Sequence, residues 1–198
     1  MLPRRPAAVV GVTLALLALA STRPAGALTL LPLDLAQLTS GAGRVFLGRV
    51  ERVDTGRDAN GLPAVWTTFA VDETLKGEAR AHITLKHLGT TFGGAGGSVV
   101  PHAGIPRYQP GESVVLFVHP ESALGFTSPV GLGQGCFRVR DRDGRRVAEN
   151  DVGNRNLAAE AGAARVQRGA AGAAIPTAEP LPLDTLLGRV RALVDAPP

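Results

Sequence analysis

The sequence predicts a mainly β fold: a small antiparallel barrel with a short N-terminal helix and a C-terminal amphipathic helix. Apolar and polar residues alternate with a period of two in several short segments between residues 44 and 150, as expected for strands with one face on a core. The chain holds 25 Gly and 15 Pro among 198 residues, so turns must be frequent. Because a sheet that closes on itself has no exposed edges, a barrel is the expected arrangement.

The first 27 residues have the composition of a secretory signal peptide. Arg4 and Arg5 form a positive start, residues 7–20 are an apolar run, and an A-x-A cleavage motif ends at Ala27. The run is shorter than the roughly 20 residues that a membrane-spanning helix needs. We therefore expect the mature protein to begin at Leu28, to be secreted or periplasmic, and to keep no stable membrane insertion after cleavage. An uncleaved N-terminal anchor is the alternative.

The charge balance argues against a nucleic-acid partner. The formal net charge is +4, but three arginines lie in the first 27 residues, and the remainder holds 18 basic and 17 acidic residues. No basic run interleaved with aromatic residues is present, although such a run is the minimum signature of nucleic-acid binding. The lone Cys136 excludes a disulfide framework within the chain. It is a packed thiol, a reactive thiol or half of a disulfide between chains.

Composition divides the chain into four segments. The signal peptide occupies residues 1–27, the β-rich domain 28–150, an Ala/Gly-rich linker 151–180, and the C-terminal helix 181–198. The linker assignment rests on ten Ala and three Gly between residues 157 and 180, which leave little apolar surface to bury.

A helix is predicted at each end of the mature chain. Leu31, Leu35 and Leu38 recur at helical spacing, and Asp34 can cap the first turn. The C-terminal segment fits either a helix that docks on the sheet or an amphipathic helix that binds a partner or a membrane surface. Its apolar stripe consists of Leu183, Leu186, Leu187, Val190, Leu193 and Val194.

The first three strands are predicted between residues 45 and 87. A strand at 45–53 contains Gly48, where a bulge fits, and the polar residues 54–63 predict a hairpin loop. The second strand, 64–76, alternates apolar and polar residues, and so does the third, 80–87.

The remaining strands lie between residues 114 and 149. Residues 114–118 are continuously apolar, as in a strand covered on both faces. Two further strands follow around the turn dipeptide Asp143-Gly144, which makes about six strands in all. We expect six strand residues to share one core: Phe69, Val71, Ile83, Leu85, Leu116 and Phe117.

The order of these segments resembles the OB-type barrel of netrin-like and tissue-inhibitor-of-metalloproteinase-like modules, and uncharacterised bacterial secreted proteins with the same layout. The matching residues are Val45, Gly48, Val50, Phe69, Val71, Lys76, Gly77, Gly111, Glu112, Leu116 and Phe117, followed by GLGQG-x-F-x-V at 131–139. The resemblance implies an OB-type barrel and a binding role. The inhibitors chelate a protease zinc through an N-terminal Cys, whereas the expected N-terminus here is Leu28, so that mechanism is not carried over.

Motifs for catalysis or metal binding are absent from the sequence. It contains no G-x-S-x-G, no H-E-x-x-H and no P-loop, and its four His are scattered, so we predict no metal site and no cofactor. The alternative to a binding protein is a secreted hydrolase with a site assembled from dispersed residues. His87, His102, Glu112 and Ser113 are the candidates for that site.

The binding surface is predicted in the long connection between residues 88 and 110, which lacks periodicity. Loops beyond about 12–15 residues in a compact domain are usually functional or disordered. This one carries exposed apolar area and groups enriched at binding hot spots, namely Val99, Val100, His102, Arg107 and Tyr108. The alternative is an excursion whose end packs Ile105 and Tyr108 back on the barrel. The sequence thus predicts a secreted non-enzymatic binding module for an unknown protein or surface ligand, a protease being one such partner.

Overall fold

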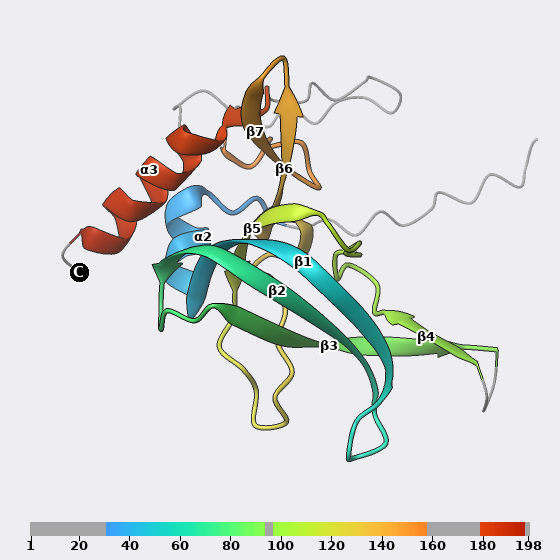
Figure 1. Ribbon diagram of the computed structural model, residues 1–198. Helices are drawn as coiled ribbons and strands as arrows, with labels where there is room; N and C mark the ends of the chain where they lie inside the picture. The colour runs from blue at the N-terminus through green and yellow to red at the C-terminus, as the bar shows by residue number, and fades with distance from the viewer. Residues whose placement is uncertain (1–30, 94–96, 158–178, 197–198) are drawn as a thin grey trace, which may run out of the picture. The chain divides into compact units, whose positions relative to one another are not determined.

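The computed structural model describes residues 31–93, 97–157 and 179–196. All but Leu31 belong to one compact unit, Pro32–Pro198. The predicted signal peptide and most of the predicted linker lie outside the described residues. The elements are α2 (Leu35–Gly41), β1 (Arg44–Arg57), β2 (Pro63–Lys76), β3 (His82–Phe92), β4 (Ser98–Pro101), β5 (Ser113–Val118), the 3-10 turn η3 (Leu132–Gly135), β6 (Cys136–Arg142), β7 (Arg145–Asn150), β8 (Leu181–Pro182) and α3 (Leu183–Asp195) (Figure 1).

The mainly β fold with two helices is confirmed. The described strands form one sheet in the order β4-β3-β2-β1-β5-β6-β7-β8, and every pairing is antiparallel. The sheet has eight strands rather than about six, and it is not closed by strand pairing. Between β3 and β5 there are only isolated bridges, which join Lys86 to Phe126 and Val118 to Pro129.

The β1–β2 hairpin is longer than predicted. Strand β1 continues to Arg57, so the predicted loop at 54–63 shrinks to residues 58–62. The Asp58 carboxylate closes that loop by accepting hydrogen bonds from the backbone N–H groups of Asn60 and Leu62, at 2.9 and 2.8 Å. The predicted irregularity at Gly48 is confirmed by a register shift between Leu47 and Gly48.

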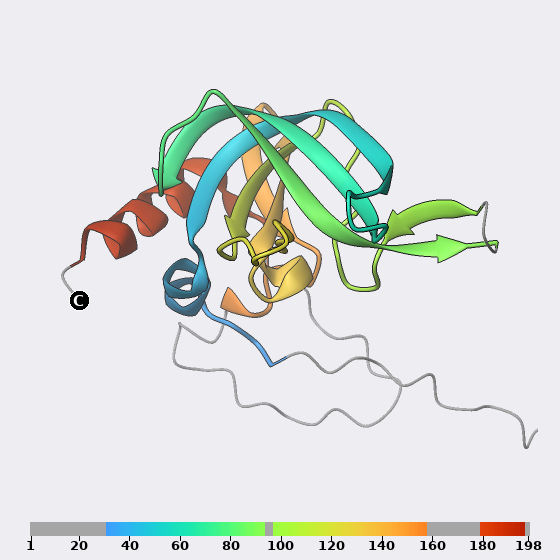
Figure 2. The same ribbon diagram turned by 90° about the horizontal axis from the view of Figure 1, so that it is seen from below.

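The predicted irregular connection at 88–110 is partly β structure. Strand β3 continues to Phe92, and β4 pairs back on it, with Thr90 opposite Val100 and Thr91 opposite Val99. β-Branched residues fit such a pleated ladder. Figure 2 shows this hairpin projecting on the side away from α3.

The core consists of two clusters, so the prediction of one shared core is wrong. Phe117 belongs to the first cluster, with Phe137 and the buried residues of α2 and α3. Leu116 belongs to the second, with Phe46, Phe69, Ile83, Leu85 and Tyr108, and Val71 packs against it. Strand β5 is buried on both faces, as predicted. Since successive strand residues point to opposite faces, its neighbours Leu116 and Phe117 enter different clusters.

Both predicted helices are present with shorter limits. Helix α2 begins after Asp34, which forms a capping box with Gln37, whereas Leu31 lies outside the helix and is 81% exposed. Helix α3 begins at Leu183, because the two residues before it pair with β7 as β8. Its buried residues pack on the first cluster, so the helix docks on the sheet.

Asparagine side chains fix residues 151–157, the first part of the predicted linker. Asn154 and Asn156 are buried. The Asn150 amide donates to the side-chain oxygen of Asn156 at 2.8 Å, and the Asn156 amide donates to the Leu33 carbonyl at 2.6 Å. These bonds join the chain after β7 to the segment that leads into α2.

Candidate functional site

The five residues predicted to form a binding surface lie on β4 and on the segment that follows it, and they differ in burial. Val99 and Val100 lie half-buried on β4, and Arg107 is exposed in the segment that follows. His102 is exposed at the end of the β3–β4 hairpin, where its Nδ1 lies 2.9 Å from the Thr90 hydroxyl. The Arg107 backbone carbonyl accepts a hydrogen bond from Arg138.

Tyr108 is not a surface contact, which corrects its predicted place. It is only 8% exposed, and its ring packs edge-on against Phe69 and stacks on His87, with centroids 5.4 and 5.8 Å apart. Burial raises the pKa of Tyr108 well above its usual value, and the adjacent Cys136 adds to the shift. Tyr108 therefore packs back on the core, as the alternative expectation had it.

His87 is a buried histidine with one bonded nitrogen. Its Nδ1 lies 2.9 Å from the Thr127 carbonyl, and because a carbonyl only accepts, Nδ1 carries the proton. Burial lowers the pKa of His87, so the ring is neutral near pH 7. Its Nε2 and the Thr67 hydroxyl are buried polar atoms with no hydrogen-bond partner among the described residues.

Cys136 is fully buried in the second core cluster. Burial, aided by the Asp151 charge, raises the pKa of its thiol to about 12. The thiolate is the reactive form, so this environment favours the packed thiol over the reactive thiol and the intermolecular disulfide.

The residues considered for a hydrolase have separate partners. His87 bonds to Thr127, His102 to Thr90, and Glu112 to Arg138. Ser113 pairs with Arg49 on one side and Val139 on the other in the sheet. In residues 31–93, 97–157 and 179–196, no group of three or more His, Cys, Asp or Glu could hold a metal ion.

A mainly apolar groove lies where the β3–β4 hairpin meets the loop after β5. Its volume is about 490 Å³. It is lined by Leu88 of β3, His102 and Ile105 after β4, Phe126 in the loop after β5, and Leu132 of η3. His102 is the only one of the five predicted binding residues that lines this apolar groove.

Lys86 contacts Phe126, one of the residues that line the apolar groove. Its Nζ donates to the Asp58 carboxylate at 2.7 Å and to the Leu124 carbonyl at 2.9 Å, and it lies 4.1 Å from the centroid of the Phe126 ring. Its hydrogen bond is the main cause of the lowered pKa of Asp58. Sequence reasoning missed this contact, because Lys86 appears only as an outward residue of a strand and Asp58 only as a turn former.

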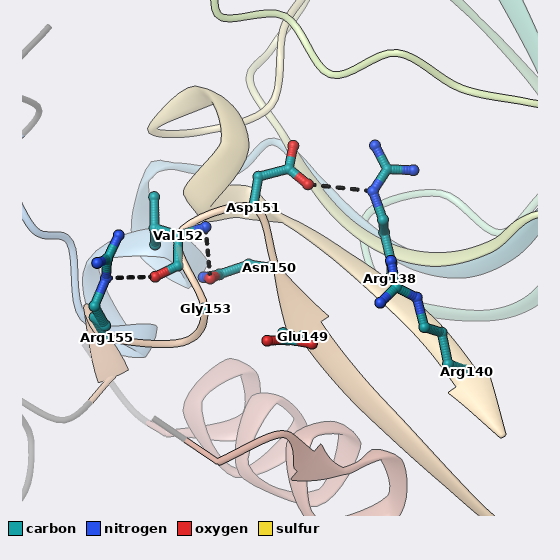
Figure 3. A pocket seen from close by; sticks show the side chains of 8 residues that line it. All are labelled: Arg138, Arg140, Glu149, Asn150, Asp151, Val152, Gly153 and Arg155. Carbon is teal, nitrogen blue, oxygen red and sulfur yellow. Dashed lines mark hydrogen bonds and ion pairs between the residues drawn. The ribbon is translucent and has the colours of Figure 1, made fainter. Parts of the chain in front are cut away.

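A second hollow, of about 340 Å³, lies on the β6–β7 hairpin and the turn after it. Figure 3 shows Arg138 and Arg140 along β6 and Glu149 on β7. Arg138 is fully engaged: it donates to Glu112 at 2.6 Å, to Asp151 at 3.2 Å and to the Arg107 carbonyl at 2.9 Å. The sequence feature that could have indicated this arginine-lined hollow is the alternation of arginines with apolar residues along β6.

No family model, curated protein or solved structure matches the chain. Within the described residues, no helix is long and apolar enough to cross a membrane.

Proposed function

We propose that the chain is a secreted, non-enzymatic binding module whose partner is a protein such as a protease. The proposal rests on the apolar groove. Leu88 is 41% exposed at its wall, and contiguous exposed apolar surface marks interaction sites in soluble proteins. An apolar side chain of the partner that enters the groove removes this surface from water, which is favourable by roughly 25 cal/mol for each Å² buried.

The finer fold assignment, an OB-type netrin-like barrel, belongs to the same proposal. Phe126 bridges to β3 and Pro129 bridges to β5, so the loop after β5 lies between these two strands. Together with β1 and β2 these segments surround the second core cluster. In small OB-type barrels, ligands bind to one strand face and the adjoining loops, and the apolar groove lies at such a place.

A matched pair of variants tests the groove. Leu88→Glu places a charge in the groove, whereas Leu62→Glu places one on the β1–β2 turn, where Leu62 is 36% exposed. The wild-type protein and both variants are used to capture partners from the organism's secreted fraction. We expect one protein to be retained by the wild type and by Leu62→Glu and lost with Leu88→Glu. Equal capture by all three would contradict a groove-bound partner.

Export is tested separately. The positive start, the apolar run and the A-x-A motif support cleavage before Leu28. N-terminal sequencing of the exported protein is expected to start at Leu28, and a cytoplasmic product that retains Met1 would refute secretion.

A secreted hydrolase is the second candidate, favoured by the 2.9 Å contact between the Thr90 hydroxyl and His102. A hydroxyl beside an imidazole is the minimum of a nucleophile–base pair. Ester hydrolysis that is abolished in both Thr90→Val and His102→Gln would support it. Hydrolysis that survives in either variant would exclude this pair.

A further inference from the structure

One face of the β6–β7 hairpin has a positive charge that grows toward its turn. From the body outward, the cross-strand pairs on that face are Arg138 with Glu149, Arg140 with Val147, and Arg142 with Arg145. The formal charge of these pairs therefore rises from zero to one and then to two. Figure 1 shows the turn of this hairpin pointing away from β1, β2 and β3.

The opposite face of the hairpin is apolar or balanced in charge. Phe137 and Ala148 belong to the first core cluster, and Val139 packs against it. Further out, Asp141 lies opposite Arg146. The uncompensated charge of the hairpin is thus confined to one face.

Three arginines on that face are free of partners. Arg138 is neutralised by Glu112 and Asp151. In contrast, Arg140, Arg142 and Arg145 are exposed, and their side chains make no ion pair or hydrogen bond with any other residue that the structure describes. We call these three residues the arginine face.

The arginine face makes no side-chain ion pair or hydrogen bond that would stabilise the fold. Like charges directly opposite each other on two strands are destabilising, and Arg142 faces Arg145 in this way. Residues two apart on a strand are separated by about 7 Å, so the guanidinium groups form a short cationic row. Each guanidinium can bind a carboxylate with two parallel hydrogen bonds.

We propose that the arginine face binds an acidic segment of a protein partner. The carboxylates interspersed with these arginines favour an acidic protein segment over a densely charged surface. Asp143 is exposed at the turn, and Glu149 lines the same hollow as Arg140. A bilayer or a nucleic acid would bring its phosphates against these carboxylates, whereas a flexible chain places its acidic groups only on the arginines.

The inference goes beyond the apolar groove and does not depend on it. A short segment connects the two surfaces, because Ile105 lines the groove and the Arg107 carbonyl accepts the hydrogen bond from Arg138. The arginine face is tested alone.

The test uses a fluorescent oligo-glutamate peptide, with oligo-glutamine of equal length as the control. The triple variant Arg140→Gln, Arg142→Gln, Arg145→Gln is expected to bind the acidic peptide roughly tenfold more weakly than the wild type, since three exposed ion pairs are lost. The control Arg52→Gln, Arg57→Gln, Arg80→Gln removes the same formal charge from β1 and from the turn before β3, where Arg52 pairs with Asp54 and Arg80 with Glu78, and it should keep wild-type affinity. Leu88→Glu should keep it too, which separates this site from the groove.

Four results would overturn the proposal. They are an equal loss of affinity in both triple variants, no preference of the wild type for oligo-glutamate over oligo-glutamine, and binding to phosphatidylglycerol vesicles through these arginines without peptide binding. The fourth is a clear fall in the thermal midpoint of Arg142→Gln, which would assign the arginine a structural role. Removal of a like-charge pair is expected to leave that midpoint unchanged or raised.

Discussion

Burial at single residues decides which groups of this protein can react. Cys136 lies beside Tyr108 and Arg138, where a surface thiol would titrate near pH 8.5, yet its pKa is about 12 because it is removed from water. The nearby Asp151 carboxylate disfavours the thiolate further. The residue therefore acts as a small apolar side chain in the second core cluster.

The first prediction concerns this thiol. At about pH 8, where an exposed thiol reacts readily, native Cys136 should not react with an aromatic disulfide reagent, and one equivalent should react after unfolding in urea. Rapid modification of the native protein would mean that the thiol is accessible and ionised.

The second prediction concerns His87. Its folded pKa lies below the ordinary value of 6.5 because burial disfavours the charged ring. The unfolded chain therefore binds a proton that the folded chain does not, and stability must fall as pH drops from about 6.5 to the lowered folded pKa. Above that window the neutral ring is present in both states, and the contribution of His87 to stability is complete.

Urea unfolding between about pH 5 and pH 7 measures this effect. His87→Phe should have a smaller loss of unfolding free energy on acidification than the wild type. His82→Gln is the control, because His82 is exposed beside Glu51. This variant should keep the loss of unfolding free energy that His87 causes on acidification. An identical pH dependence in wild type and His87→Phe would contradict the assignment.

At the scale of elements, the alternation of apolar residues located six strands, but it could not locate β4 and β8. These two strands have four and two residues, too few for a period to be visible. Each forms because a longer neighbour offers a free edge, which is a tertiary effect. The Ala/Gly-rich composition that suggested a linker from residue 151 likewise gave no sign of the hydrogen bonds that hold Asn154 and Asn156.

The candidate site was predictable only in part, for a related reason. His102 was identified, and it does line the apolar groove. Tyr108 was assigned to the surface from its residue type, but its ring fills a space between Phe69 and His87. The Lys86–Asp58 ion pair joins residues 28 positions apart, and no local pattern signals such a contact.

The third prediction tests the β3–β4 hairpin as an element. A Cβ at Gly89 would lie 2.6 Å from Val99 Cγ1 and 3.2 Å from the backbone of Pro63 and Ala64. Gly89→Ala should therefore destabilise the fold by about 1–3 kcal/mol, measured as a fall in the thermal midpoint.

A glycine in open space provides the control for Gly89. Gly188 lies in α3 with no atom within 4 Å of a built Cβ, so Gly188→Ala should stabilise the protein by about 0.5–1 kcal/mol through helix propensity. If Gly89→Ala also raised the midpoint, Val99 could not be packed over Gly89 as the structure has it.

For the whole molecule, the main consequence of the fold is the division of the core into two clusters by the sheet. The first cluster joins the helices to residues of β1, β2, β5, β6 and β7, and the second lies among β1, β2, β3, β5 and β6. Both candidate surfaces are outside these clusters. The apolar groove borders the second through β3 and the loop after β5, and the arginine face is on the hairpin whose other face packs on the first.

The fourth prediction is that Phe69 and Phe117 contribute independently to stability. Truncation of either to Ala should cost about 3–5 kcal/mol, as for other buried Phe, but the milder Phe→Leu keeps the protein folded for a double-mutant cycle. Phe69→Leu and Phe117→Leu lie in different clusters, so their costs should add within about 0.5 kcal/mol.

Phe46→Leu with Phe69→Leu is the matched pair in one cluster, with ring centroids 5.4 Å apart, and its coupling should exceed about 0.5 kcal/mol. Denaturant unfolding gives all the free energies required. Strong coupling between residues 69 and 117, as large as that between 46 and 69, would restore the single core that the sequence predicts and remove its division into two clusters.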